Sequence, residues 1–362
     1  PPLAAPEGLG GAPRLAADAA SSSLAARVRL PLPAPHKGDG AASALPLPLP
    51  LPSAQASPRE AAPAEQSPAD AAVAKPLAVK REVDALIAEL PELRLRRPEI
   101  ARQIEDLATV FNHALLANDV YADKPNPELL PAGCSRLSPQ ELAALHLSPN
   151  DLVSTKSGYV AAIYKTAQGR YVVANRGTTS GDSAAKDWKT NLQQGAGRRA
   201  SQYDDAIRAA LKIHAALPGQ VDFVGHSKGG GLAQAQALAT HSPAVVFNAA
   251  ALHGNTLGRH GLHARHANGL VRAYNVGGEV LNRLQDKTPG IVPSVRGGRF
   301  ELPAVKPPVS TAAGLAWEGE MGKLSTMKHA VALHGMDSVI DSLGWQLDNL
   351  RRDAAPARSP QL

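Results

Sequence analysis

The chain has 362 residues, a formal net charge of +6 and an isoelectric point near 9.4. This length suffices for one large domain or two ordinary ones, and the charge suits weak attraction to anionic surfaces. Because aromatic residues make up only 4% of the chain, it lacks the basic face interleaved with aromatics that is typical of nucleic-acid binding, and we expect no nucleic-acid partner.

The single cysteine, Cys134, excludes an intrachain disulfide and a cysteine-based metal site. No apolar run reaches the roughly 18 residues that predict a transmembrane helix. The first residues also lack the basic-then-apolar pattern of a Sec signal peptide. We expect neither a metal nor another cofactor, and the sequence leaves the oligomeric state open.

The beginning of the chain differs in composition from the rest. Residues 1–78 are rich in Ala, Pro, Ser and Leu, with the repeat "LPLPLPLP" at 45–52. Proline removes backbone donors and few side chains here are bulky enough to bury, so we expect a disordered region without a packed core. The folded domain is then predicted to span 79–352, and 353–362 to form a disordered tail.

The first predicted helices precede the sheet. Residues 79–121 indicate two helical stretches, broken near Pro91 and again around Pro98, because proline interrupts the helical hydrogen-bond ladder. In the second stretch, apolar residues recur at three- and four-residue spacing, which predicts a stripe that docks against a sheet. They are Ile100, Ile104, Leu107, Val110, Phe111, Leu115 and Leu116.

Strands and helices then alternate. Residues 158–180 contain two β-rich runs around the turn signal Ala167-Gln168-Gly169, which predicts a hairpin. Such alternation predicts an α/β fold with a mainly parallel sheet and helices on both faces. The later predicted elements are a helix at 203–219, a strand at 221–224, a helix at 230–242, strands at 244–250 and 270–279, and a final helix at 336–352.

A serine lies at the corner between a strand and a helix. Ser227 is flanked two residues away on each side by Gly225 and Gly229, which matches a nucleophile elbow, where a strained turn exposes the serine hydroxyl. The amide of Lys228 would face a developing oxyanion at the helix N-terminus. The alternative is a glycine-rich loop with a solvated serine. We interpret His226 as a packing or hydrogen-bonding residue.

A nucleophilic serine needs a base, and the base needs an orienting carboxylate. In α/β-hydrolases the order along the chain is serine, acid, histidine, which favours His334 as the base, on a loop before the last helix, with His329 as the alternate. Glu279 follows a strand end and is the favoured acid, whereas Asp286 competes with it. Asp337 is assigned to the start of the final helix.

The loop at 251–269 carries several histidines. Their H-x2-H-x2-H spacing could bind a metal, but the segment is rich in Gly and Arg and contains no carboxylate, so we predict a mobile basic loop instead. The histidines are His253, His260, His263 and His266.

Several segments together resemble the class 3 (fungal-type) lipases over about residues 98–350. The lipase-like segments are "YVVANRGTT", "KDWKTN", "FVGHSKGGGLA", "VVFNAAALH" and "HGMDSVI". Two others, "LANDVY" and "YNVGGEVLNRLQ", are closer to a bacterial branch of lipase-like proteins that includes secreted effectors of plant-associated bacteria.

This resemblance implies roles for individual residues. Ser227 would be the nucleophile and His334 the base, and Glu279 would be the acid at a position where class 3 lipases usually have Asp. Thr178 matches the second oxyanion donor and would act together with the Lys228 amide.

The same resemblance implies how the oxyanion loop is surrounded. Asn175 replaces an aromatic residue of the family and would alter the pocket wall, and a lid would lie at 180–201. The residues that would brace the loop are Arg176, Asp187, Trp188 and Asn191.

The family acts on carboxyl esters of long-chain lipids through an acyl-enzyme. The resemblance therefore implies a lipase or phospholipase with a lipid substrate, membrane-surface association and secretion, including delivery into a host cell. The alternative is a lipid-binding effector on a hydrolase scaffold with little turnover. The charges that motivate this alternative are those of Arg198, Arg199, Arg259 and Arg265.

Overall fold

The computed structural model describes residues 68–178, 196–287, 295–305 and 320–355. All of them belong to one compact unit, Ala64–Leu362. Most of the region predicted to be disordered, 1–78, and most of the predicted tail, 353–362, lie outside the described residues.

A mostly parallel sheet forms the centre of the unit, in the order β1-β3-β4-β5-β6-β7-β8, with β2 paired to β3. Strands β4 to β8 are parallel to one another, whereas β3 is antiparallel to β4, β1 and β2. The strands are β1 (Ser135–Arg136), β2 (Val153–Ser154), β3 (Tyr159–Lys165), β4 (Tyr171–Asn175), β5 (Val221–His226), β6 (Ala244–Phe247), β7 (Val271–Val276) and β8 (Gly298–Leu302).

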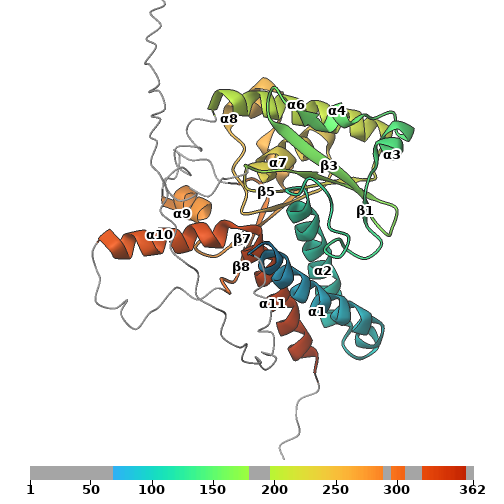
Figure 1. The fold of residues 1–362 in the computed structure, drawn as a ribbon, viewed down its shortest axis with the longest axis vertical. Coiled ribbons are helices and arrows are strands. Elements are labelled where there is room, and N and C mark those ends of the chain that lie inside the picture. Colours follow the sequence, from blue (N-terminus) through green and yellow to red (C-terminus); the bar gives the residue numbers. More distant parts are fainter. Residues whose placement is uncertain (1–67, 179–195, 288–294, 306–319, 356–362) are drawn as a thin grey trace, which may run out of the picture. The chain divides into compact units, whose positions relative to one another are not determined.

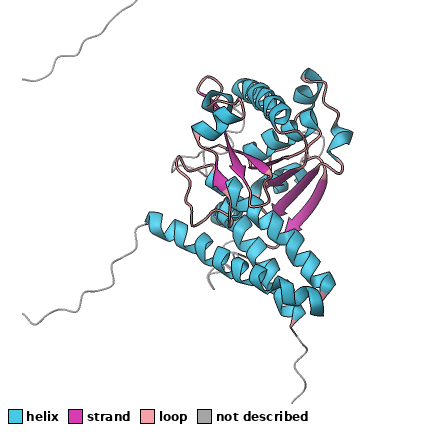
Figure 2. Ribbon diagram, turned by 90° about the vertical axis from the view of Figure 1, so that its right-hand side faces the viewer, coloured by secondary structure: helices cyan, strands magenta, loops and turns pink. Residues whose placement is uncertain are grey.

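Helices cover both faces of this sheet, which confirms the predicted α/β fold (Figures 1 and 2). They are α1 (Pro68–Arg96), α2 (Pro98–Asp119), α3 (Pro139–Ala144), α4 (Pro149–Leu152), α6 (Ala196–Ala216), α7 (Lys228–Thr240), α8 (Gly254–Arg259), α9 (Val280–Lys287), α10 (Glu320–His334), α11 (Met336–Ala354) and the short 3-10 helix η1 (Ala264–Ala267).

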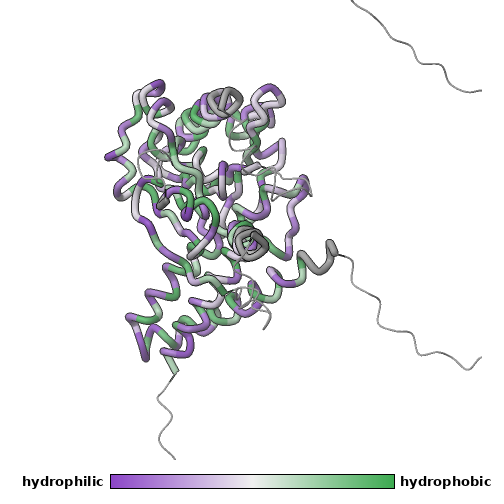
Figure 3. The backbone as a smooth tube through the Cα atoms, turned by 90° about the vertical axis from the view of Figure 1, so that its left-hand side faces the viewer, coloured by the Kyte–Doolittle hydropathy of each residue, from purple (hydrophilic) through white to green (hydrophobic). Residues whose placement is uncertain are grey.

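The two faces of the sheet bury separate apolar cores, because successive strand residues point to opposite sides. Val172 and Val224 belong to the core that α1, α2 and α11 cover. Val173 and Phe223 belong to the core beneath α6 and α7. In Figure 3 the helices in the lower part of the view alternate between hydrophilic and hydrophobic residues, as expected for elements with one buried face.

Helix α1 corrects one prediction. It runs through Pro91, where a break was expected, and ends at Arg96. Pro91 removes one backbone donor, but Leu86 and Leu90 just before it are buried in the core, and this packing favours the helix over the local break. The predicted break at Pro98 is confirmed, because Arg97 has a non-helical backbone (φ −144°, ψ 67°).

Helix α1 also begins at Pro68, upstream of the predicted domain start at residue 79. Among the residues of α1 that belong to the core shared with α2 and α11, the first partly buried one is Val79 and the first buried one is Val83. In the described part of the chain this core therefore begins close to residue 80, and the domain start at residue 79 stays a prediction.

The remaining predicted elements are largely confirmed. The hairpin at 158–180 is β3 and β4, and the final helix is α11. The segment 251–269 was predicted to be a loop, but it contains α8 and η1, with His253 Nδ1 accepting a hydrogen bond from the Asn255 N–H. Helices as short as these lack the repeated apolar spacing that makes a helix visible in sequence.

None of the described helices combines the length and the apolar character that crossing a membrane would require.

Candidate active site

The corner after β5 holds Ser227 in a strained conformation. Its φ of 55° and ψ of −124° are uncommon for a residue with a side chain. The neighbouring strand end fixes the turn, because Ser227 N–H donates to Phe247 O at 3.1 Å and Ser227 O accepts from Ala250 N at 2.9 Å. The predicted sharp turn between strand and helix is confirmed.

The flanking glycines are required by close backbone approaches. A Cβ on Gly225 would lie 2.3 Å from Gly229 O, and a Cβ on Gly229 would lie 2.1 Å from Asn175 O. A Cβ on Gly230 would lie 2.6 Å from the Ala249 side chain. Real Cβ atoms do not come so close, so this spacing of small residues is a steric condition for the elbow.

The imidazole of His334 lies between a hydroxyl and a carboxylate. Its Nε2 is 2.9 Å from Ser227 Oγ and its Nδ1 is 2.8 Å from Glu279 Oε2. His334 is the last residue of α10, followed by Gly335 as the N-cap of α11. The prediction that His334 lies on a loop before the last helix is therefore wrong, and a junction between two helices presents the imidazole instead.

Glu279 is fully buried just beyond the end of β7. Gly278, with φ 78°, turns the chain there. The carboxylate accepts the Leu281 N–H at 2.8 Å and the Asn282 N–H at 2.6 Å. These donors belong to the first turn of α9, so the positive end of that helix faces the carboxylate.

The alternatives named from the sequence lie elsewhere. His329 is a half-buried residue of α10, and among the described residues the imidazole bonded to Ser227 Oγ is that of His334. Asp286 belongs to α9, with its side chain outside the described residues. Asp337 is exposed in the first turn of α11, as expected.

His226, the residue before the serine, is buried, and its two ring nitrogens contact groups other than the serine hydroxyl. Its Nδ1 is 2.9 Å from Tyr121 Oη and its Nε2 is 2.7 Å from the backbone carbonyl of His334. Burial, with a further contribution from His334, lowers the pKa of His226 from 6.5 to about 3, so its imidazole is neutral. Its interpretation as a packing or hydrogen-bonding residue is consistent with these contacts.

The predicted oxyanion donors lie near the elbow. Lys228 is the first residue of α7, and Thr178 is exposed just after β4. Between β4 and Thr178, Gly177 packs against the elbow, because a Cβ on Gly229 would lie 3.0 Å from Gly177 N. The structure thus brings the Thr178 loop beside the start of α7.

Residues around this loop are only partly described. Arg176 is half-buried, whereas Asp187, Trp188, Asn191 and most of the predicted lid at 180–201 lie outside the described residues. The Asn175 amide is buried and donates to Gln236 Oε1 at 2.6 Å and to Val224 O at 3.3 Å. Asn175 is therefore part of the interface between the sheet and α7.

The histidine-rich segment 251–269 makes its own contacts. His260 Nε2 is 2.7 Å from Asp204 Oδ1, and the ring of His266 lies 5.4 Å from those of His241 and His263. Within the described part of the chain, no group of three His, Cys, Asp or Glu side chains is arranged to hold a metal ion.

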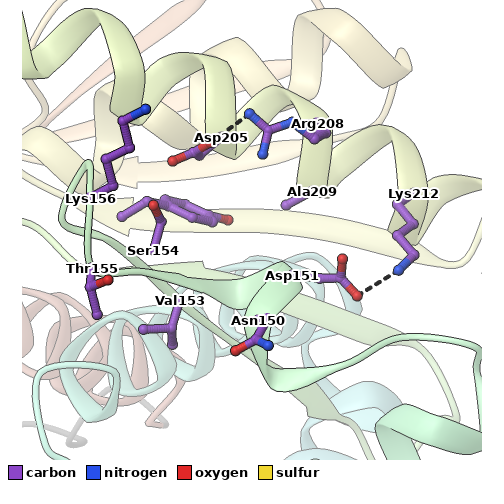
Figure 4. A pocket seen from close by; sticks show the side chains of 11 residues that line it. Asn150, Asp151, Val153, Ser154, Thr155, Lys156, Asp205, Arg208, Ala209 and Lys212 are labelled. Carbon is purple, nitrogen blue, oxygen red and sulfur yellow. Dashed lines mark hydrogen bonds and ion pairs between the residues drawn. The ribbon is translucent and has the colours of Figure 1, made fainter.

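A hollow of about 260 Å³ lies apart from the Ser227 cluster, between the β2 region and α6. Figure 4 shows its two ion pairs, Asp151 with Lys212 and Asp205 with Arg208, both 2.6 Å long. Neither Ser227 nor its partners line this hollow, which we call the α6 hollow.

Two residues of the site were missed by sequence reasoning. Tyr121 reaches His226 from the end of α2, and Asn248 Nδ2 donates to His334 O at 2.9 Å. Tyr121 ends the motif "LANDVY" that carries the bacterial resemblance, which was the available signal. Asn248 has a positive φ of 42°, and no local sequence pattern marks it.

Comparison with known proteins identifies the family of this chain. Residues 112–325 match the model of the Tle-like phospholipase domain. The chain is also 32% identical over 254 residues to an extracellular phospholipase A1 of Serratia liquefaciens, covering 69% of this chain and 75% of that protein. The resemblance to lipase-like proteins is therefore confirmed, whereas the likeness to class 3 enzymes in particular stays a prediction.

Proposed function

Because the chain belongs to the Tle-like phospholipase family, we propose that it cleaves phospholipid carboxyl esters with Ser227 as nucleophile, His334 as base and Glu279 as orienting acid. The family makes the chain a carboxylic ester hydrolase. The observation that carries the residue roles is the unbroken contact from Ser227 Oγ through the His334 imidazole to the Glu279 carboxylate, at 2.9 and 2.8 Å.

The proposed chemistry proceeds in two halves. His334 Nε2 takes the proton of Ser227 as Oγ attacks the ester carbonyl, and it then delivers that proton to the departing alcohol. The acyl group remains on Ser227 until a water, deprotonated by the same imidazole, releases the fatty acid. Glu279 stabilises the imidazolium and keeps the Nδ1 proton directed toward itself.

The negative charge on the attacked carbonyl oxygen needs fixed donors. We assign this role to the backbone amide of Lys228, at the positive end of α7, and to Thr178 on the neighbouring loop. The contact between Gly177 and the elbow supports this pairing, because it holds the Thr178 loop close to the start of α7.

The proposed substrate is a phospholipid at a membrane surface. The net charge of +6 favours approach to anionic lipid. The relative from Serratia liquefaciens is an extracellular enzyme, which supports secretion of this chain. Delivery into a host cell as an effector is a finer proposal, based on the resemblance of the motifs at 116–121 and 274–285 to secreted bacterial effectors.

The test is mass spectrometry of the products formed from vesicles of mixed phospholipids and acylglycerols. We expect the wild type to release fatty acid and lysophospholipid, and Ser227→Ala to lose activity by a factor of about 10⁴ to 10⁶. Unchanged hydrolysis by a folded Ser227→Ala protein would refute the assignment of the nucleophile.

The same vesicles test the alternative of a lipid-binding protein with little turnover. Vesicle binding without hydrolysis by the wild type would favour that alternative. Of the arginines that motivate it, Arg259 pairs with Asp204 at 3.3 Å, and the side chains of Arg198 and Arg199 lie outside the described residues.

A further inference from the structure

A series of contacts connects three parts of the proposed active site. The hydroxyl of Tyr121 packs against Gly177, where a Cβ would collide with Tyr121 Oη, and Tyr121 Oη is 2.9 Å from His226 Nδ1. His226 Nε2 then lies 2.7 Å from the backbone oxygen of His334. The loop that carries Thr178, the elbow and the end of α10 are thus joined by two side chains that do not contact Ser227 Oγ.

The direction of each hydrogen bond follows from the chemistry of the groups. The carbonyl of His334 can only accept, so His226 must carry its proton on Nε2. Burial keeps the His226 imidazole neutral by lowering its pKa to about 3, so Nδ1 has no proton and accepts from Tyr121. Tyr121, His226 and the His334 carbonyl then each have a consistent role as hydrogen-bond donor or acceptor.

The backbone carbonyl of His334, which accepts the hydrogen bond from His226, is held from a second side as well. Asn248 Nδ2 donates to it at 2.9 Å, and Asn248 Oδ1 accepts the Val276 N–H at 2.8 Å. The rings of His226 and His334 also pack with centroids 4.9 Å apart. The backbone of His334 is therefore held by β5 and β6 together, directly beneath the imidazole that contacts Ser227.

Tyr121 is itself anchored through the end of α2. Asp119, two residues earlier, accepts hydrogen bonds from Arg136 Nη2 at 2.7 Å and from Tyr164 Oη at 2.6 Å. It also accepts the Asn126 N–H at 3.1 Å. This buried cluster fixes the turn that follows α2, so the hydroxyl of Tyr121 has a defined place from which to reach His226.

We propose that Tyr121 and His226 are positioning residues, which set the angle of the His334 imidazole by holding the His334 carbonyl and set the place of the Thr178 loop by packing against Gly177. The inference rests on the proposed function. Reacting groups displaced by about 1 Å lose roughly a hundredfold in rate. Removing the contacts of Tyr121 and His226 should therefore lower kcat about 10- to 100-fold. KM should stay nearly unchanged, since neither side chain is assigned to substrate binding.

The test compares Tyr121→Phe, His226→Phe, His226→Gln and the double variant Tyr121→Phe/His226→Phe. Kinetics on phospholipid vesicles give kcat and KM, and the rate of labelling by a fluorophosphonate probe reports the reactivity of Ser227 without phospholipid. Of the single variants, we expect His226→Phe to have the lowest kcat and the lowest labelling rate. We expect His226→Gln to recover part of the rate, because its amide can still donate to the His334 carbonyl.

Coupling between the two residues separates positioning from general destabilisation. Tyr121→Phe should slow the wild type but have little further effect in the His226→Phe background, where its acceptor is gone. The matched control is Tyr159→Phe, which removes another buried hydroxyl, bonded to Gln236 Nε2, and should leave kcat unchanged. Thermal unfolding of each variant shows that the compared proteins are folded.

Additive losses, or wild-type kcat and labelling rates in both single His226 variants, would overturn the inference. A wild type that labels rapidly but releases no fatty acid from phospholipid would instead contradict the proposed substrate. In that case the labelling rates still decide whether Tyr121 and His226 position the site.

Discussion

Ser157 and Ser227 each lie near a carboxylate, and their surroundings make them different. At the α6 hollow, Ser157 Oγ donates directly to Asp205 Oδ2 at 2.6 Å. At the elbow, the His334 imidazole lies between Ser227 and Glu279. A carboxylate alone is too weak a base to deprotonate an alcohol, whereas an imidazole can accept that proton near neutral pH. The serine and the acid are common to both places, and only the elbow adds the base.

The carboxylates themselves are also held differently. Partial burial acts to raise the pKa of Asp205, but hydrogen bonds from Ser157 and Ser154 and the Arg208 guanidinium hold it below its ordinary value. Glu279 has no exposed side-chain surface and is bonded to backbone N–H groups and His334. Asp205 thus closes a surface ion pair, whereas the carboxylate of Glu279 is directed at one imidazole.

Removing the charge of each carboxylate should give the largest difference in kcat between the two places. Glu279→Gln should lower kcat on phospholipid by about 10³- to 10⁴-fold, because the imidazole loses the group that orients it and stabilises its charge. The matched change Asp205→Asn should leave kcat within about twofold, since the surface pair contributes only about 1 kcal/mol or less to stability. Equal losses in the two variants would contradict the assigned roles.

Threonines give a smaller version of the same contrast. Thr178→Val keeps the shape of the side chain but removes the hydroxyl proposed to face the oxyanion, and kcat should fall about 10- to 1000-fold. Thr155 lines the α6 hollow, so Thr155→Val should leave kcat unchanged. Steady-state kinetics on one phospholipid decides, and an unaffected Thr178→Val enzyme would restrict the role of Thr178 to its backbone.

The two places should also respond to acid in different pH windows. The folded pKa of His226 is about 3, below its ordinary value of 6.5. Below pH 6.5 the unfolded chain therefore binds a proton that the folded chain excludes, and stability falls as the pH falls, by up to about 1.4 kcal/mol per pH unit. The lowered pKa of Asp205 acts only below about pH 4.

Urea unfolding at pH 7, 6, 5 and 4 checks this difference. The loss of unfolding free energy between pH 6 and 4 should be smaller in His226→Gln than in the wild type, and unchanged in Asp205→Asn. A His226→Gln protein with the same dependence on pH as the wild type would show that His226 does not titrate in this window.

The sequence by itself determined the features that depend on a few neighbouring residues. The elbow could be predicted because the spacing of Gly225, Ser227 and Gly229 follows from steric contacts within a single turn. The hairpin of β3 and β4 and the apolar stripe of α2 were predictable for the same reason, since side-chain periodicity is local. Chain order and family resemblance then singled out His334 and Glu279.

Only the tertiary structure decided which distant residues meet. Tyr121 precedes His226 by 105 positions and Asn248 precedes His334 by 86, and their bonds depend on how α2, β6 and α10 pack around the sheet. The same packing keeps α1 helical through Pro91 and makes the residues before His334 a helix. Such outcomes depend on the free energy of burial and of polar groups paired across elements, which no local window of sequence contains.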